Sequence, residues 1–139
     1  YNANPQSMRA AISVLADTHS SWKVAILGDM FELGPYAPAL HAGVGDYLGK
    51  RGIDCLVAVG KLSEHMAQGA REAGVPMVYS CADKEAAKVV LPQVVRPDST
   101  ILVKASRGMA LEELTAQLLT LCVRGRYDRY FRIQSGQRI

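Results

Sequence analysis

Four short runs of apolar and β-branched residues recur along the chain, with amphipathic segments between them. The runs occupy residues 22–27, 55–59, 76–80 and 99–103. A strand that is apolar at nearly every position is typical of a sheet covered on both faces. Regular alternation of such strands with helices indicates right-handed parallel crossovers. We therefore predict an α/β fold: a three-layer Rossmann-like domain with a mostly parallel sheet flanked by helices.

Apolar residues at helical spacing predict five helices around these strands. They lie at about residues 5–18, 39–51, 62–73, 83–94 and 111–121. No internal repeat or low-complexity linker interrupts the pattern, and the composition changes only near Val123, where arginines become frequent. We therefore divide the chain into one domain, residues 1–122, and an arginine-rich tail of unknown role, residues 123–139.

The charge of the chain is concentrated in this tail. Of the 16 basic and 13 acidic residues, five arginines and one aspartate lie in the last sixteen positions, which leaves the preceding body with a net charge of −1. A body of this kind is not a basic nucleic-acid platform, so nucleic acid is not an expected partner. Aromatic residues among the tail arginines permit stacking on nucleic acid or binding to an anionic surface. The alternative, which we favour, is a species-specific extension.

Several classes of protein are excluded by composition. No run approaches the roughly 18 apolar residues of a membrane span, and the first residues lack the plan of a signal peptide. We expect a soluble cytoplasmic protein without a membrane partner. Cys55, Cys81 and Cys122 have no CxxC spacing and no histidine at metal-ligand spacing, so we expect free thiols and no metal site.

Polar residues follow the first predicted strand, in the sequence GDMFELG. In open parallel sheets, ligands bind at the carboxyl ends of the strands. Asp29 is expected at this edge with Glu32 one helical turn onward, where two carboxylates could orient an amine, a ribose or a hydrated magnesium ion. The alternative is that they cap a helix or lie in a solvated loop.

The last predicted strand ends in KASRGM, which combines two cations, a hydroxyl and a glycine. Lys104, Ser106, Arg107 and the backbone amides of a helix after Gly108 can converge on one anion. The alternative is that Ser106 caps the helix while both cations face solvent. Neither GxxxxGK[ST] nor GxGxxG occurs in the chain, so we expect no nucleotide-hydrolysing site within it.

The chain begins with YNANPQSM, in which Asn2 and Asn4 flank an alanine just ahead of a helix. An asparagine at the position of Asn4 is a good helix N-cap, which would explain one amide but not both. This motif, LGDMFELG with the downstream His41, and VKASRGMALEEL, in this order and spacing, resemble the C-terminal domain of the Mur ligases. The resemblance extends from Tyr1 to about Leu121.

This resemblance implies a three-domain ATP-dependent amide ligase of which this chain is the third domain, inactive alone. Within the family, the nearest members add D-Ala-D-Ala to UDP-N-acetylmuramoyl-tripeptide in peptidoglycan precursor synthesis. This reaction serves cell-wall biogenesis, cell shape and cell division. The implied partners are these two substrates and the two N-terminal domains of the same enzyme. ATP and Mg²⁺ would be bound mainly by the central domain, and no catalytic residue is assigned within this chain.

The family's functional residues can be carried over by position. The resemblance places Asn2 and Asn4 beside the nucleotide. It places Asp29, Glu32 and His41 beside the incoming dipeptide, and Lys104, Ser106 and Arg107 on the carboxylate of that dipeptide. Two alternatives remain open. One is a flavodoxin-like binding or receiver module, with Asp29 or Asp83 accepting phosphate, and the other is a purely structural interaction domain.

Overall fold

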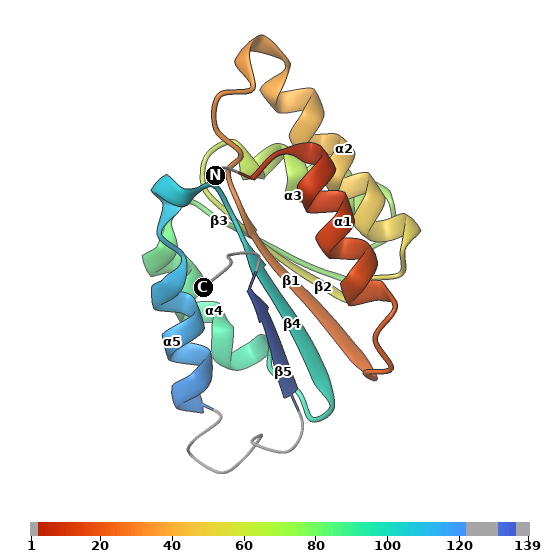
Figure 1. Cartoon of the computed structure of the whole chain (residues 1–139), viewed down its shortest axis with the longest axis vertical. Coiled ribbons are helices and arrows are strands. Elements are labelled where there is room, and N and C mark those ends of the chain that lie inside the picture. Colours follow the sequence, from red (N-terminus) through yellow and green to blue (C-terminus); the bar gives the residue numbers. More distant parts are fainter. Residues whose placement is uncertain (1–2, 122–130, 136–139) are drawn as a thin grey trace.

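The computed structural model describes residues 3–121 and 131–135, and these form a sheet of parallel strands in the order β3-β2-β1-β4-β5 (Figure 1). The strands are β1 Trp22–Gly28, β2 Cys55–Val59, β3 Met77–Cys81, β4 Ser99–Lys104 and β5 Phe131–Ser135. The first four are the predicted strands, each displaced by at most one residue at either end. All four pairings are parallel.

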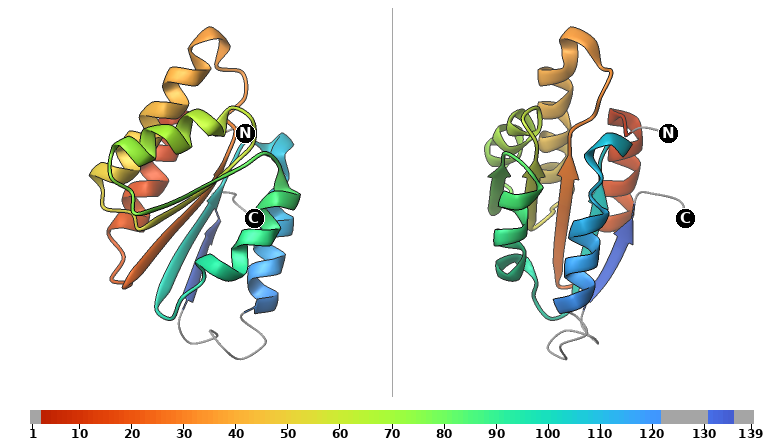
Figure 2. Two further views of the ribbon diagram at one scale, coloured as in Figure 1. Left: turned by 180° about the vertical axis from the view of Figure 1, so that it is seen from behind. Right: turned by 90° about the vertical axis from the view of Figure 1, so that its left-hand side faces the viewer.

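Five α-helices of the described residues cover the two faces of this sheet (Figures 1 and 2). They are α1 Pro5–Ala16, α2 Ala37–Lys50, α3 Ser63–Glu72, α4 Lys84–Val94 and α5 Glu112–Leu121. Buried residues of α1, α2 and α3 form one core with the sheet, and those of α4 and α5 form the other. The predicted three-layer α/β fold is confirmed.

Alternate residues of β1 supply the two cores. Ala25 and Leu27 pack with α1, α2 and α3, whereas Val24 and Ile26 pack with α4 and α5. All four are fully buried, because side chains of a strand point to opposite faces in turn and both faces are covered. This is the physical reason for apolar runs without polar alternation.

Strand β5 was not predicted. It lies within the arginine-rich segment and pairs with β4 in parallel, with Phe131 opposite Ser99 and Ser135 opposite Val103. Its sequence, FRIQS, alternates apolar and polar residues, so it lacks the continuous apolar character used to find the other strands. The remaining residues of the predicted tail, 123–130 and 136–139, lie outside the described part of the chain.

Helices α2 and α3 pack backbone to backbone. A Cβ added to Gly45 would lie 2.1 Å from the carbonyl oxygen of Met66, and one added to Gly69 would lie 2.3 Å from that of Ala42. Real Cβ atoms do not approach backbone so closely, so only glycine permits this separation at either position. The two helices therefore form a closely packed pair on one face of the sheet.

The carboxyl ends of the strands and the first turn of α1 lie at one edge of the domain (Figures 1 and 2). The loops after β1 and β4 are directly joined there, because the main-chain N–H of Ser106 donates to the carbonyl oxygen of Asp29 over 3.1 Å. The motifs of the sequence thus meet at this edge. None of the helices within residues 3–121 is long and apolar enough to cross a membrane.

Candidate functional site at the carboxyl edge

The loop after β1, residues 29–33, has a different shape from the one expected. Glu32 was expected one helical turn beyond Asp29, but these residues form no helix. Glu32 instead has φ 62°, in the left-handed region that residues other than glycine rarely adopt. Glu32 is exposed and Asp29 is buried. The two carboxylates therefore lie in different environments.

The Asp29 carboxylate is bonded within the protein. Its Oδ1 accepts hydrogen bonds from the backbone N–H of Ser63, over 2.8 Å, and from the Ser63 hydroxyl, over 2.7 Å. Ser63 begins α3, and the N-cap residue Leu62 makes no side-chain capping bond. Asp29 therefore caps α3 from a distant point in the sequence, so the helix-capping alternative describes this bond.

Gly60 makes room for this carboxylate. It has φ +117°, and a Cβ there would lie 2.5 Å from both carboxylate oxygens of Asp29. Nothing in the sequence revealed this packing. The role of Ser63 was also missed. Its only signal in the sequence was its place near the start of a predicted helix.

His41, expected beside the incoming dipeptide, is fully buried and bonded to backbone through both ring nitrogens. Its Nε2 accepts the N–H of Met30 over 3.0 Å, and its Nδ1 lies 2.7 Å from the carbonyl oxygen of Ala37. An amide can only donate and a carbonyl can only accept, so the ring is the neutral tautomer with its hydrogen on Nδ1. His41 thus joins α2 to the loop after β1.

Ser106 also faces the loop after β1. Its side chain is 1% exposed, and its Oγ accepts the N–H of Phe31 over 2.9 Å. Ser106 makes no side-chain cap, and the segment after it is the 3₁₀ turn η2 Arg107–Met109. Helix α5 begins only at Glu112. This start is within one residue of the predicted one, and the turn η2 separates Ser106 from the helix.

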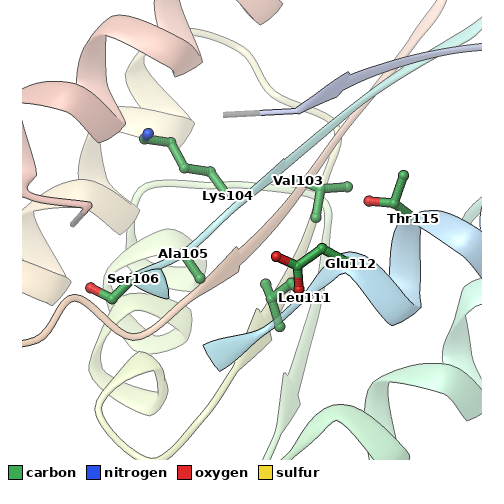
Figure 3. A pocket seen from close by; sticks show the side chains of 7 residues that line it. All are labelled: Val103, Lys104, Ala105, Ser106, Leu111, Glu112 and Thr115. Carbon is green, nitrogen blue, oxygen red and sulfur yellow. The ribbon is translucent and has the colours of Figure 1, made fainter. Parts of the chain in front are cut away.

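The two cations of this loop differ in exposure. Arg107 is exposed, whereas Lys104 is 7% exposed. Burial lowers the pKa of the Lys104 ammonium below its ordinary value of 10.5. Figure 3 shows its side chain extending away from Val103 and Glu112. The convergence of Lys104, Ser106 and Arg107 on one anion remains a prediction.

A shallow hollow of about 280 Å³, including space open to solvent, lies beside this loop (Figure 3). Its lining comprises Val103, Lys104, Ala105, Ser106, Leu111, Glu112 and Thr115. The carboxylate of Glu112 places negative charge at this hollow. We therefore do not assign the hollow the expected role of holding an anion.

At the start of α1, Asn4 is the N-cap. Its Oδ1 accepts the N–H of Ser7 over 2.8 Å, and its own N–H donates to the Ser7 hydroxyl over 3.1 Å. This reciprocal pair is a capping box, so the helix-capping alternative describes Asn4. Asn2 lies outside the described residues.

The described residues provide no metal site. Within residues 3–121, no three side chains of His, Cys, Asp or Glu are grouped so that they could hold a metal ion. Cys55 and Cys81 are free and buried, as expected, and burial raises the pKa of the Cys55 thiol to about 12. Cys122 lies outside the described part.

Residues 1–107 match the protein family described as "Mur ligase, glutamate ligase domain". The chain belongs to the Mur ligase family. Two bacterial Mur ligases, each named UDP-N-acetylmuramoyl-tripeptide–D-alanyl-D-alanine ligase, are similar in sequence. That of Escherichia coli K12 is 40% identical over 85% of this chain and 25% of its own length. That of Bacillus subtilis 168 is 34% identical over 86% of this chain and 26% of its own length.

Solved Mur ligase structures agree with the fold. A crystal structure of MurF from Acinetobacter baumannii superposes with a TM-score of 0.75 at 34% identity, covering 86% of this chain and 27% of that chain. This chain thus spans about a quarter of the length of the relatives it matches. Membership of the Mur ligase family confirms the resemblance seen in the sequence and disfavours the receiver-module alternative.

Within this Mur ligase domain, the expected site residues fall into two groups. Asp29, His41 and Ser106 are buried and hydrogen-bonded to backbone. Glu32 and Arg107 are exposed at the same edge. The sequence could not separate these groups, because every member is polar and lies within or near a motif.

Proposed function

We propose that this chain is the C-terminal domain of an ATP-dependent ligase that adds D-Ala-D-Ala to UDP-N-acetylmuramoyl-tripeptide during peptidoglycan precursor synthesis. The observation that carries this proposal is the 40% identity, over 85% of the chain, to a relative with that name. The meeting of the three motif-bearing segments at one edge supports it. In our proposal this edge faces the cleft where the two substrates react.

The exposed charges suit the two ends of the dipeptide. Arg107 would hold the dipeptide carboxylate together with Lys104, while Glu32 would orient its amine. Charge-assisted hydrogen bonds of this kind contribute roughly 1.5–3 kcal/mol each. Fixing the amine beside an activated carboxyl group makes a bimolecular attack effectively unimolecular. Asn4, and Asn2 before it, would lie beside the nucleotide.

We assign ATP and Mg²⁺ mainly to the remainder of the ligase. The sequence contains no GxxxxGK[ST] pattern, and residues 3–121 offer no cluster for a metal ion. The residues of this chain therefore do not fit either group as its principal site. ATP bound elsewhere would activate the carboxyl group, and this domain would bring the dipeptide to it. We place the intact enzyme in the cytoplasm, because ATP and UDP-linked precursors are supplied there.

Mass spectrometry of the reaction products tests the proposal on the intact ligase that contains this domain. We expect the amide product only when ATP, Mg²⁺, the UDP-linked tripeptide and D-Ala-D-Ala are all present. D-alanyl-D-alaninamide is the matched control because it has the same amine but lacks the carboxylate, and it should need a much higher concentration. Failure to form product from D-Ala-D-Ala would overturn the proposal.

The 139-residue chain alone should form no product under the same conditions. It lacks the phosphate-binding pattern that the reaction requires. Amide formation by the purified chain would show that the division of labour proposed above is wrong.

A further inference from the structure

Three consecutive residues of the loop after β1 are each hydrogen-bonded to a different part of the fold. Asp29 accepts from Ser63 of α3, Met30 donates to His41 of α2, and Phe31 donates to Ser106 after β4. We call the side chains of Ser63, His41 and Ser106 the loop clamp. Each holds the loop from another direction, so no single residue of 29–31 can turn without breaking a bond.

The clamp is shielded from water. His41, Ser63 and Met30 are fully buried, and Ser106 is 1% exposed. A buried amide that loses its acceptor keeps the cost of its desolvation without compensation. Releasing the buried Met30 amide is therefore unfavourable, which favours a single conformation of the loop.

Glu32 follows these three residues directly and has φ 62°. A left-handed residue other than glycine is strained, and such strain persists only where the surroundings determine the backbone. The clamp on one side and the partly buried Leu33 on the other provide these surroundings. The exposed Glu32 carboxylate is thus presented from a backbone that cannot relax.

Ser106 bonds to the same loop twice. Its N–H donates to the Asp29 carbonyl oxygen over 3.1 Å, and its Oγ accepts the Phe31 N–H over 2.9 Å. Arg107 is the next residue. The separation of the backbone at Glu32 from the backbone at Arg107 is therefore set by these two bonds together with the clamp.

We infer that His41 and Ser106 are positioning residues that set the spacing between Glu32 and Arg107, and that this spacing selects a zwitterionic ligand of dipeptide length. The inference rests on the proposed function for the identity of the ligand. One further residue in a peptide moves the carboxylate by roughly 3.5 Å. A pair of opposite charges carried on fixed backbone positions discriminates more strongly against that change than a pair carried on a mobile loop.

The test uses two His41 variants of the intact ligase. His41→Leu has a similar size and removes the acceptor of the Met30 N–H, whereas His41→Gln keeps a carbonyl oxygen as acceptor. We expect His41→Leu to raise the KM for D-Ala-D-Ala by roughly tenfold to hundredfold, with the KM for ATP changed less than about twofold. It should also reduce the preference for D-Ala-D-Ala over D-Ala-D-Ala-D-Ala. His41→Gln should keep most of the wild-type affinity for D-Ala-D-Ala and most of the preference for the dipeptide over the tripeptide.

His19→Leu is the matched control. His19 is exposed and lies between α1 and β1, at the opposite edge of the sheet. The same chemical change there should leave the KM for D-Ala-D-Ala, the KM for ATP and the dipeptide preference unaltered. Ser106→Ala removes the acceptor of Phe31 without adding volume and should act in the same direction as His41→Leu, which keeps the test usable if His41→Leu does not fold.

Amide hydrogen exchange in the 139-residue chain tests the clamp without ligase activity. His41→Leu should accelerate exchange at Met30, and Ser106→Ala should accelerate it at Phe31. If the intact wild-type ligase does not use D-Ala-D-Ala, the proposed function fails while this measurement still tests the clamp. If the wild type is active but folded His41→Leu and Ser106→Ala keep its dipeptide KM and length preference, the positioning inference is overturned.

Discussion

The loops after β1 and β4 lie side by side at the carboxyl edge, but they are held in different ways. Side chains from three parts of the fold hold the β1 loop. The β4 loop instead closes on itself through main-chain bonds, from Met109 N–H to the Ser106 carbonyl and from Ala110 N–H to that of Arg107. The difference teaches that polar residues of a motif can serve to hold the backbone, and that burial distinguishes Asp29, His41 and Ser106, which do so, from the exposed Glu32 and Arg107.

The largest expected effect comes from removing the carboxylate of the β1 loop. Asp29→Ala should lower the free energy of unfolding by about 3 kcal/mol, because it leaves the N–H and hydroxyl of Ser63 buried without their acceptor. Asp29→Asn, which keeps Oδ1 as an acceptor, should lose less than half as much. Urea denaturation of the 139-residue chain measures both. Equal losses would mean that the bonds to Ser63 are not what stabilises the loop.

Removing a cation of the β4 loop should affect binding more than folding. In the intact ligase, Arg107→Ala should raise the KM for D-Ala-D-Ala by about tenfold, equivalent to about 1.4 kcal/mol, while ATP binding and the melting temperature stay near wild type. Lys104→Ala should weaken dipeptide use in the same direction. Steady-state kinetics provide the measurement, and unchanged constants in both variants would remove the carboxylate-holding role.

A smaller effect of opposite sign is expected at Glu32. Glycine adopts φ 62° without strain, so Glu32→Gly should raise the free energy of unfolding by about 1 kcal/mol. The same variant should use the dipeptide less well, since it lacks the carboxylate. Thermal unfolding paired with kinetics checks both halves. A stability loss would indicate that the side chain contributes more to folding than its backbone strain costs.

The smallest effect concerns pH. Burial lowers the pKa of Lys104 below 10.5 in the folded chain, so the unfolded chain binds more protons between the two pKa values. Stability attributable to this group therefore rises with pH through that window. Comparison of wild type with Lys104→Met by urea denaturation at a series of pH values below 10.5 should show this rise in the wild type only. A fall over the same range would contradict the assigned direction.

Most of the fold was predictable from local patterns. The four apolar strands stand out because both sheet faces are covered, and helix capping was one of the two roles considered for Asn4 from its place just ahead of a helix. Strand β5 was missed because pairing with β4, rather than continuous apolar character, defines it. The β1 loop could not be deduced either, since Asp29 is joined to Ser63 and Phe31 to Ser106 across long stretches of sequence.

The close packing of α2 against α3 has a consequence for movement. His41 comes from α2 and Ser63 from α3, and glycines at positions 45 and 69 bring the backbones of these helices into contact. Sliding one helix past the other would press the carbonyl groups of each helix against the backbone of its neighbour. The pair therefore resists shear. If this domain rotates during a catalytic cycle, the β1 loop must move with it as part of one rigid body. The bending must then take place at a hinge elsewhere.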